Sequence, residues 1–140
     1  MNITARINLL VSEINGVFHD VSIAMGLSDS ASIILYTLNS YGSCLLSDIV
    51  RLSGISKQTI NSALRKLESE GIVAVTPEDP RRKRVSLTQK GEALAERTVG
   101  KMIAVENDLF ASWPEEDRES YLRLTQRYLD QIKEGFQEII

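Results

Sequence analysis

Four cations stand in succession in a chain whose overall charge is negative. They are Arg81, Arg82, Lys83 and Arg84, in the segment "DPRRKRVSLTQKG". The 140 residues carry a formal net charge of −3, yet residues 51–90 contain nine Lys or Arg against four Asp or Glu, a local net charge of +5. Because the field near a protein surface follows the charges within roughly 8–10 Å, this part of the chain can attract a polyanion.

Uncharged polar side chains precede the cations at helical spacing. Amide, hydroxyl and guanidinium groups recur at three- or four-residue steps along residues 57–66. Such groups hydrogen-bond to base edges in the major groove of DNA, and a helix N-terminus attracts phosphate. We therefore expect five side chains to read bases: Gln58, Thr59, Asn61, Ser62 and Arg65. Lys57 and Lys66 are expected to approach phosphates.

A helix-turn-helix pattern would position this polar face. In "LSDIVRLSGISKQTINSALRKLESEGIV" a short helix is expected from Ser47 through Leu52, and Gly54 predicts the turn. Ser56 is a typical N-terminal cap for a second helix that runs from Lys57 to about Glu70. The second helix would bury one apolar stripe, formed by Ile60, Leu64 and Leu67. Its opposite face would then stay open to a ligand.

After Gly71 the apolar period changes from helical to twofold. "IVAVT" and "RVSLT" are short β-rich runs separated by "PEDPRRK", which predicts a two-stranded hairpin with a charged tip. Arg81, Arg82 and Lys83 at this tip could reach the neighbouring minor groove or backbone, since a narrow minor groove attracts Arg. Asp79 stands two residues before Arg81, and we expect it to hold the shape of the loop through an ion pair.

Both ends of the chain carry apolar seams with the alternating three- and four-residue steps of helix-on-helix packing. In residues 1–25 the seam consists of Ile3, Ile7, Leu10, Ile14, Val17 and Val21. In residues 115–140 it consists of Leu122, Thr125, Leu129, Ile132, Phe136 and Ile139. We expect both segments to form a two-fold symmetric dimer interface, with an intramolecular core as the alternative. A DNA-binding lobe is expected over residues 28–91, and it begins with a helix capped by Ser28. One helix over residues 88–110 would connect this lobe to the dimerisation segments.

Three motifs in register carry a resemblance to a known family. They are "SDIVRLSGISKQTI", "LESEGIV" and the wing pattern D-x-R-x-x-x-V-x-L-T-x-x-G, which is met by Asp79, Arg81, Val85, Leu87, Thr88 and Gly91. With these motifs the chain resembles a MarR-family transcription regulator over nearly its whole length. The resemblance implies a winged-helix homodimer that binds palindromic DNA and responds to a small ligand or to oxidation.

The fold class that follows is mainly α with a small two-stranded β wing. We expect a single winged-helix domain over residues 1–140, with the helix-turn-helix and wing as its DNA-binding lobe and the terminal helices for dimerisation. The predicted function is a sequence-specific DNA-binding transcription regulator, a repressor that a small-molecule effector releases. The alternative is a winged-helix module that binds a protein partner and no DNA.

Effector and redox sites are less strongly indicated. A ligand pocket between the dimerisation helices and the DNA-binding lobe would have His19, Tyr36 and Tyr41 as polar aromatic candidates, although such residues also occur in cores. Cys44 lies at the expected start of a helix, whose N-terminus could depress the pKa of a thiol. The alternative for Cys44 is a small buried apolar residue.

Several function classes are excluded on composition. The sequence has one His and one Cys, which is poor material for a metal site, and no cofactor motif. No nucleophile–His motif and no glycine-rich phosphate loop is present, so we predict that the chain is not an enzyme. The longest apolar runs are far too short to span a membrane, and with no export signal we expect the chain in the cytoplasm.

Overall fold

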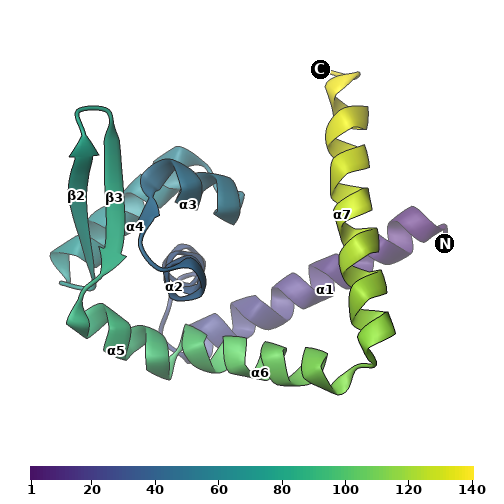
Figure 1. Cartoon of the computed structure of the whole chain (residues 1–140), viewed down its shortest axis with the longest axis horizontal. Helices are drawn as coiled ribbons and strands as arrows, with labels where there is room; N and C mark the ends of the chain where they lie inside the picture. The colour runs from purple at the N-terminus through teal and green to yellow at the C-terminus, as the bar shows by residue number, and fades with distance from the viewer. The chain divides into compact units, whose positions relative to one another are not determined.

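The chain folds into seven helices and one three-stranded antiparallel sheet (Figure 1), in a computed structural model that describes all 140 residues. The elements are α1 (Ile3–Ala24), α2 (Asp29–Tyr41), β1 (Cys44–Leu45), α3 (Leu46–Ser53), α4 (Lys57–Ser69), β2 (Val73–Asp79), β3 (Arg82–Leu87), α5 (Gln89–Arg97), α6 (Val99–Ser112) and α7 (Glu115–Gln137). They form two compact units, Met1–Met102 and Ile103–Ile140.

Local sequence signals set the ends of the helices. The side chain of Ser28 accepts a hydrogen bond from the backbone N–H of Ala31, and that of Ser56 accepts one from Thr59, so both predicted caps are confirmed. Such a cap satisfies a backbone donor that the first helical turn leaves without a partner. Gly54 has a φ of 68°, a left-handed conformation that few other residues adopt, and it makes the predicted turn between α3 and α4.

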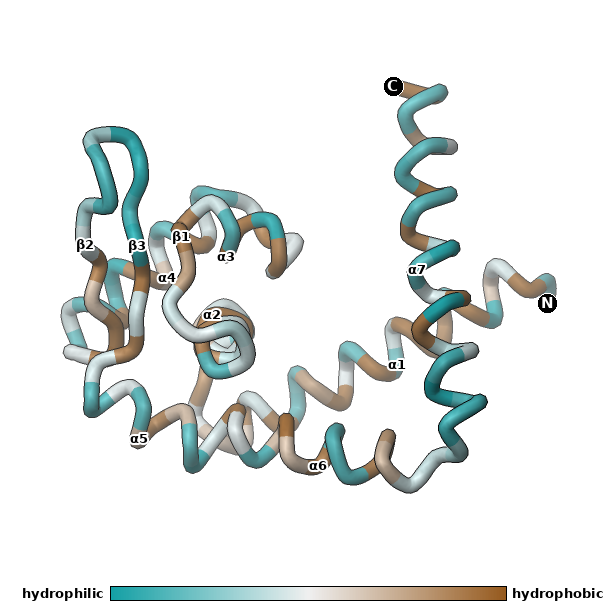
Figure 2. The backbone as a smooth tube through the Cα atoms, in the orientation of Figure 1, coloured by the Kyte–Doolittle hydropathy of each residue, from teal (hydrophilic) through white to brown (hydrophobic).

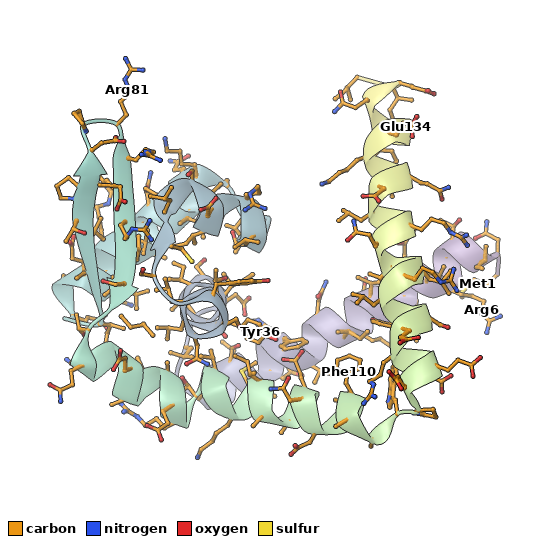
Figure 3. The ribbon with its side chains drawn as sticks, viewed as in Figure 1. Met1, Arg6, Tyr36, Arg81, Phe110 and Glu134 are labelled. Carbon is orange, nitrogen blue, oxygen red and sulfur yellow. The ribbon has the colours of Figure 1, made fainter.

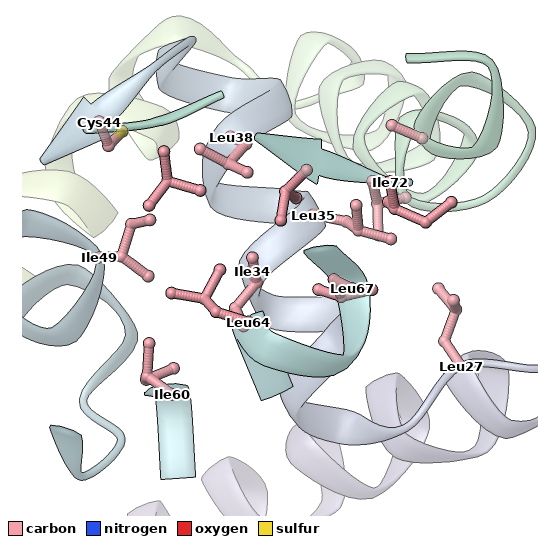
Figure 4. Close-up of a cluster of buried hydrophobic side chains, with 14 of the residues drawn as sticks. Leu27, Ile34, Leu35, Leu38, Cys44, Ile49, Ile60, Leu64, Leu67 and Ile72 are labelled. Carbon is pink, nitrogen blue, oxygen red and sulfur yellow. The ribbon is translucent and has the colours of Figure 1, made fainter. Parts of the chain in front are cut away.

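The core of the first unit is built around α2. Ile34 and Leu35 are fully buried on this helix, and they lie among side chains from α3, α4 and the sheet (Figure 4). Ile49 of α3, Ile60 of α4 and Val85 of β3 are fully buried in the same cluster. Each such side chain contributes about 1.5–3 kcal/mol through its removal from water. The helix-turn-helix and the wing are therefore attached to one common core.

The sheet contains one strand more than the sequence predicted. β2 and β3 form the expected hairpin, with Val75 opposite Val85, and the short strand β1 pairs with the other edge of β3 through Cys44 and Val85. The helix expected from Ser47 through Leu52 is α3, but Cys44, which was expected at the start of a helix, lies in β1 before it. A strand of two residues is too short to show the alternation by which strands are predicted.

The single helix predicted over residues 88–110 is wrong, because the chain breaks at Thr98. Its φ of −122° and ψ of −98° lie outside the helical region and separate α5 from α6. Thr98 is buried, and its hydroxyl donates to the carbonyl of Leu94 at 2.7 Å. A Thr that bonds back to the preceding turn can bend a helix, although Thr37 makes the same bond inside the unbroken α2. Gly100, a residue that weakens helices, lies two positions beyond Thr98.

The second unit consists of the end of α6 and the whole of α7. Phe110, Trp113 and Tyr121 form an aromatic cluster with ring centroids 5.0 to 6.0 Å apart. Pro114 is the N-cap of α7, directly before its acidic first turn. The apolar residues of α7 stay exposed, with Leu122 at 71% and Phe136 at 59% of their full area.

The seam of α1 is exposed as well. Ile3, Leu10 and Val17 keep 73%, 59% and 63% of their area accessible. The tube of Figure 2 shows hydrophobic positions recurring along α1. Only Val21, at the end of the seam, packs against the core. Within its own unit, each seam is therefore exposed for most of its length. No single helix has the length and hydropathy to cross a membrane, although α1 and α2 taken together would pass that test with a bend of 96° between them.

Substitution of Gly91 tests how α5 docks on the sheet. A methyl group at Gly91 would collide with the backbone carbonyl of Ile72 and would lie 3.3 Å from the side chain of Leu87. We expect Gly91→Ala to lower the free energy of unfolding by about 1–3 kcal/mol, because backbone must move to relieve the overlap. Gly16→Ala is the matched control, since nothing lies within 4 Å of its Cβ position. It should stabilise α1 by up to about 1 kcal/mol. Denaturant unfolding measures both, and equal effects of the two variants would contradict this packing.

Candidate nucleic-acid interface

The helix α4 has one buried face and one open face. Ile60, Leu64 and Leu67 are buried, as predicted, and they fix the rotation of the helix on the core. Gln58 and Arg65 are exposed, and Asn61 is half-buried. The polar stripe therefore faces away from the interior of the protein.

Two adjoining clefts separate α4 from the wing. One is lined by Lys57, Gln58, Asn61 and Arg65 of α4 together with Lys83 of β3. The second continues past the start of α3, and its lining combines α4 with the tip of the wing: Lys57, Asn61, Arg81, Arg82 and Lys83. Seven of the ten predicted DNA-binding residues thus border one hollow between helix and wing, with Lys57, Asn61 and Lys83 common to both clefts.

The other three predicted residues lie elsewhere on α4. Ser62 and Lys66 are exposed but border neither cleft. The hydroxyl of Thr59 is engaged in the helix cap, where it accepts a hydrogen bond from the hydroxyl of Ser56 at 2.9 Å. Glu68, which no prediction included, lines the first cleft. The sequence shows Glu68 eleven residues after Lys57 in the same expected helix. Its acidic charge, however, argued against a place in a DNA-binding surface.

Asp79 organises the tip of the wing. One carboxylate oxygen accepts the backbone N–H groups of Arg81 and Arg82 at 2.9 Å each, and the other pairs with Nε of Arg82 at 2.6 Å. The expected ion pair is present, but its partner is Arg82, three residues away, and not the nearer Arg81. The side chain of Arg81 projects outward from the tip (Figure 3). This arrangement presents one guanidinium and uses another to stiffen the turn.

Arg84 ties the wing to the rest of the lobe. Its Nε donates to Glu78 across the hairpin at 2.7 Å, and Nη1 lies 3.3 Å from both the backbone carbonyl and the hydroxyl of Ser43. Since Ser43 precedes β1, the hairpin is connected through one side chain to the segment that leads into α3. The sequence showed Arg84 only as the start of the β-rich run "RVSLT", and its bonds to Glu78 and Ser43 could not be seen there.

These contacts depress the pKa values of both acids of the wing. The pKa of Glu78 is lowered first by the hydrogen bond from Arg84 and then by its charge. The pKa of Asp79 is lowered first by the backbone hydrogen bond from Arg81 and then by the side chain of Arg82. Both carboxylates are therefore ionised at neutral pH, when the wing can hold its shape.

Cys44 does not fit the redox role. Cys44 is buried, and its thiol donates to the carbonyl of Gly42 at 3.3 Å. Burial is the main cause that raises its pKa, the charge of Asp48 adds to the effect, and Arg84 opposes it. The expectation that a helix N-terminus could depress this pKa is wrong, because Cys44 lies in β1 and two residues before α3 begins. A raised pKa leaves little of the reactive thiolate.

A separate cavity of about 460 Å³ lies in the first unit, between α1 and α2. His19 of α1 and Tyr36 of α2, two of the predicted effector-binding residues, line it, as does Ile55 from the turn between α3 and α4. Tyr41, the third candidate, lies at the end of α2, is 67% exposed and does not border the cavity. The spacing of a helix explains this, because Tyr41 is five residues after Tyr36 and points in another direction.

The fold is that of a winged-helix protein, and comparison with known proteins identifies its family. A model of the MarR family matches residues 25–84. An uncharacterized HTH-type transcriptional regulator, YwoH of Bacillus subtilis (strain 168), is 31% identical over 107 residues, which are 76% of this chain and 78% of the relative. The chain therefore belongs to the MarR family and is a transcriptional regulator. Proteins of this family are non-enzymatic and bind DNA, in agreement with the predictions from sequence.

Solved structures share the fold. NMB1585, a MarR family regulator from Neisseria meningitidis, is 23% identical with a TM-score of 0.79, over 96% of each chain. MepR of S. aureus in complex with DNA is 19% identical with a TM-score of 0.73, over 94% of this chain and 98% of its own. NadR in complex with 4-hydroxyphenylacetate is 22% identical with a TM-score of 0.71, over 94% and 92%. At these identities the likeness establishes the winged-helix fold.

The wing should lose its shape in acid before the core unfolds. Because the pKa of Asp79 is lowered in the folded chain, its clamp is complete above the ordinary carboxyl pKa of 3.8 and is lost as the pH falls through the lowered value. Limited proteolysis at the wing can be followed from neutral pH downward with an acid-stable protease. Cleavage should become faster only once the pH falls below the ordinary carboxyl pKa of 3.8. Asp79→Asn should be cleaved faster already at neutral pH, whereas Asp20→Asn on α1 should behave as the parent. Equal cleavage of both variants would contradict the role of Asp79.

The thiol of Cys44 should be nearly inert in the folded protein. Reaction with a disulfide reagent at neutral pH should be about tenfold or more slower than in the denatured chain, because burial and the raised pKa both limit thiolate. Peroxide treatment should leave DNA affinity unchanged, with Cys44→Ala as the control that cannot be oxidised at this position. A loss of affinity that only the parent suffers would restore Cys44 as a sensor.

Proposed function

We propose that the chain is a repressor that binds a palindromic operator as a homodimer, with α4 in the major groove and the wing tip at the adjacent minor groove. The observation that carries this proposal is the hollow between α4 and the wing, where Lys57, Asn61, Arg65 and Lys83 converge. In a chain of net charge −3, residues 51–90 carry a net charge of +5, and part of this excess borders the hollow together with hydrogen-bonding groups. A duplex supplies both the phosphates and the base edges that these groups bind.

The side chains of α4 are proposed to contact either bases or phosphates, according to their chemistry and position. Gln58, Asn61 and Arg65 have the amide and guanidinium groups that form paired hydrogen bonds with adenine and guanine. Ser62 and Thr59 remain proposed base contacts, with the hydroxyl of Thr59 shared with the helix cap. Lys57 and Lys66 are proposed to bind phosphates on opposite sides of the helix.

The wing tip would bind the minor groove. Arg81 projects freely from the tip and is the side chain proposed to enter a narrow groove, where the negative potential is strongest (Figure 3). Arg82 is partly committed to Asp79, and with Lys83 it would contact the flanking backbone. Asp79 itself is proposed to shape the turn and not to touch DNA.

Exposed seams on α1 and α7 support the homodimer. Residues such as Leu10 and Val17 on α1, and Leu122 and Phe136 on α7, expose more apolar area than a monomer usually leaves in contact with water. A second copy of the chain would cover these seams with two-fold symmetry. The two α4 helices would then meet half-sites about 34 Å apart, which is one turn of DNA.

The cavity between α1 and α2 supports release by a small molecule. NadR, whose fold is similar, has been solved with the small aromatic acid 4-hydroxyphenylacetate. In this chain Ile55 belongs both to the cavity wall and to the turn that joins α3 to α4. A ligand at Ile55 could therefore shift α4, and it would release DNA to the extent that it binds the shifted form more tightly.

DNA binding across a range of salt concentrations tests the central part of this proposal. The purified full chain should bind the DNA upstream of its own coding region, and the affinity should fall steeply with salt, with a log–log slope of about −0.9 for each phosphate contact. A protein-docking module, the alternative, would show no specific DNA complex and no such slope. That result would refute the proposed function.

Two substitutions separate the roles of helix and wing. Arg65→Ala should cost about 1–3 kcal/mol of binding and relax the preference for one base pair in each half-site. Arg81→Ala should weaken binding most where the flanking DNA is A·T-rich, because the narrow minor groove there attracts Arg. Lys101→Ala removes an exposed cation outside both clefts and is the matched control. Equal weakening on specific and random DNA would contradict base reading by Arg65, and indifference to flank composition would contradict groove insertion by Arg81.

A further inference from the structure

The cavity between α1 and α2 has an acidic side chain in its lining and no Lys or Arg. Its ten lining residues include the carboxylate of Asp29 but no Lys and no Arg. The remaining polar groups are Asn15, His19, Ser22, Ser32 and Tyr36. An anionic ligand would therefore meet a fixed negative charge and no permanent positive charge to pair with. The partial positive charge at the N-terminus of α2 does little to attract an anion, because the acidic Asp29 itself lies in the first turn of that helix.

Asp29 can still accept hydrogen bonds from a ligand. Nδ1 of His19 lies 2.8 Å from both of its oxygens, but the side chains of His19 and Asp29 are 52% and 60% exposed. An ionised carboxylate has about four acceptor sites, so one imidazole nitrogen leaves several of them open at the rim of the cavity. A cationic donor at this rim would form the stronger, charge-assisted kind of hydrogen bond.

Two buried hydroxyls add a second acceptor deeper in the cavity. Oγ of Ser22 lies 2.8 Å from the carbonyl oxygen of Phe18 and 2.8 Å from Oγ of Ser32, and both serines are buried. A hydroxyl has one hydrogen and two lone pairs. Both contacts are satisfied together when Ser22 donates to the carbonyl of Phe18 and Ser32 donates to Ser22. The oxygen of Ser32 then keeps lone pairs for a donor on the ligand.

Aromatic and apolar side chains complete the wall. Phe18 and Tyr36 meet edge to face, with ring centroids 6.5 Å apart and planes at 82° (Tyr36 is labelled in Figure 3). Ile33 and Met102 supply the rest of the apolar surface. The faces of aromatic rings attract cations, by about 0.5–2 kcal/mol, and flat apolar groups pack well against such a wall. The rings therefore favour the same sign of charge as Asp29 does.

From these features we propose that the cavity binds an aromatic organic cation, with its ring against Phe18 and Tyr36 and its ammonium group at Asp29. The volume of about 460 Å³ suits a ligand of one or two rings. This inference names the class of effector in the proposed function and rests on that function only for its regulatory consequence. Binding of the ligand itself does not depend on DNA.

A matched series of three small molecules tests the charge preference. They share one phenol ring and one methylene group and differ only in the final group: 4-hydroxybenzylamine is a cation, 4-hydroxyphenylacetamide is neutral and 4-hydroxyphenylacetate is an anion. Isothermal titration of the full chain without DNA should rank the amine first and the acid last, with at least about a fivefold difference between them, the size expected for partly exposed charges.

Three variants locate the preference. Asp29→Asn keeps the size and first-turn position of the side chain but removes its charge, and it should abolish most of the difference between amine and acid. Asp20→Asn makes the same change on α1, outside the cavity, and should leave the difference intact. His19→Ala should bind the amine more tightly than the parent, because Asp29 then loses its present partner.

Several results would overturn the proposal. They are an acid that binds as tightly as the amine, the absence of binding by all three compounds up to the millimolar range, or a loss of amine affinity in His19→Ala equal to that in Asp29→Asn. Failure of the proposed regulatory function gives a different result. The amine would bind with the predicted preference, yet the chain would bind no DNA, or its DNA affinity would not change when the amine is added.

Discussion

Burial of α2 against both the helix-turn-helix and the wing is the constraint on which the rest of the structure depends. Ile34 and Leu35 are fully buried on α2, and the cluster around them includes Ile60 of α4 (Figure 4). Val85 of β3 belongs to the same cluster. The polar face of α4 and the tip of the wing both border the hollow described above. Because closely packed interiors deform little, one core fixes the width of the hollow that a duplex would have to fit.

Surface side chains add further contacts that hold the wing in place on the core. Asp79 stiffens the wing tip through Arg82 and the backbone, and Arg84 joins the hairpin to the segment before α3. Both devices hold a hairpin that would be marginal alone. The cavity lies on the other side of α2, and Ile55 links its wall to the turn before α4. Thus α2 separates a surface with the chemistry for DNA from a cavity with the chemistry for an organic cation.

Much of this architecture could be predicted from the sequence because its signals are local. Ser28, Ser56 and Gly54 mark helix ends through hydrogen bonds within three residues or through a single backbone angle, and all three were predicted correctly. The missed features depend on contacts between distant segments. They are the pairing of β1 with β3 and the bond from Arg84 to Ser43. Burial of Cys44, by contrast, was one of the two roles considered for it from the sequence. The break at Thr98 has no comparably clear local signal, because Thr37 makes the same hydroxyl bond inside the unbroken α2.

The joint action of helix and wing on one duplex is the central claim, and lysine modification measures it most directly. Acetylation of the full chain, read by mass spectrometry with and without its upstream DNA, reports each lysine separately. Lys57 on α4 and Lys83 on the wing share both clefts and should lose reactivity together on the same DNA, while Lys101 and Lys133 should keep theirs. Protection of Lys57 without Lys83, or of Lys83 without Lys57, would show that helix and wing do not form one DNA-binding surface.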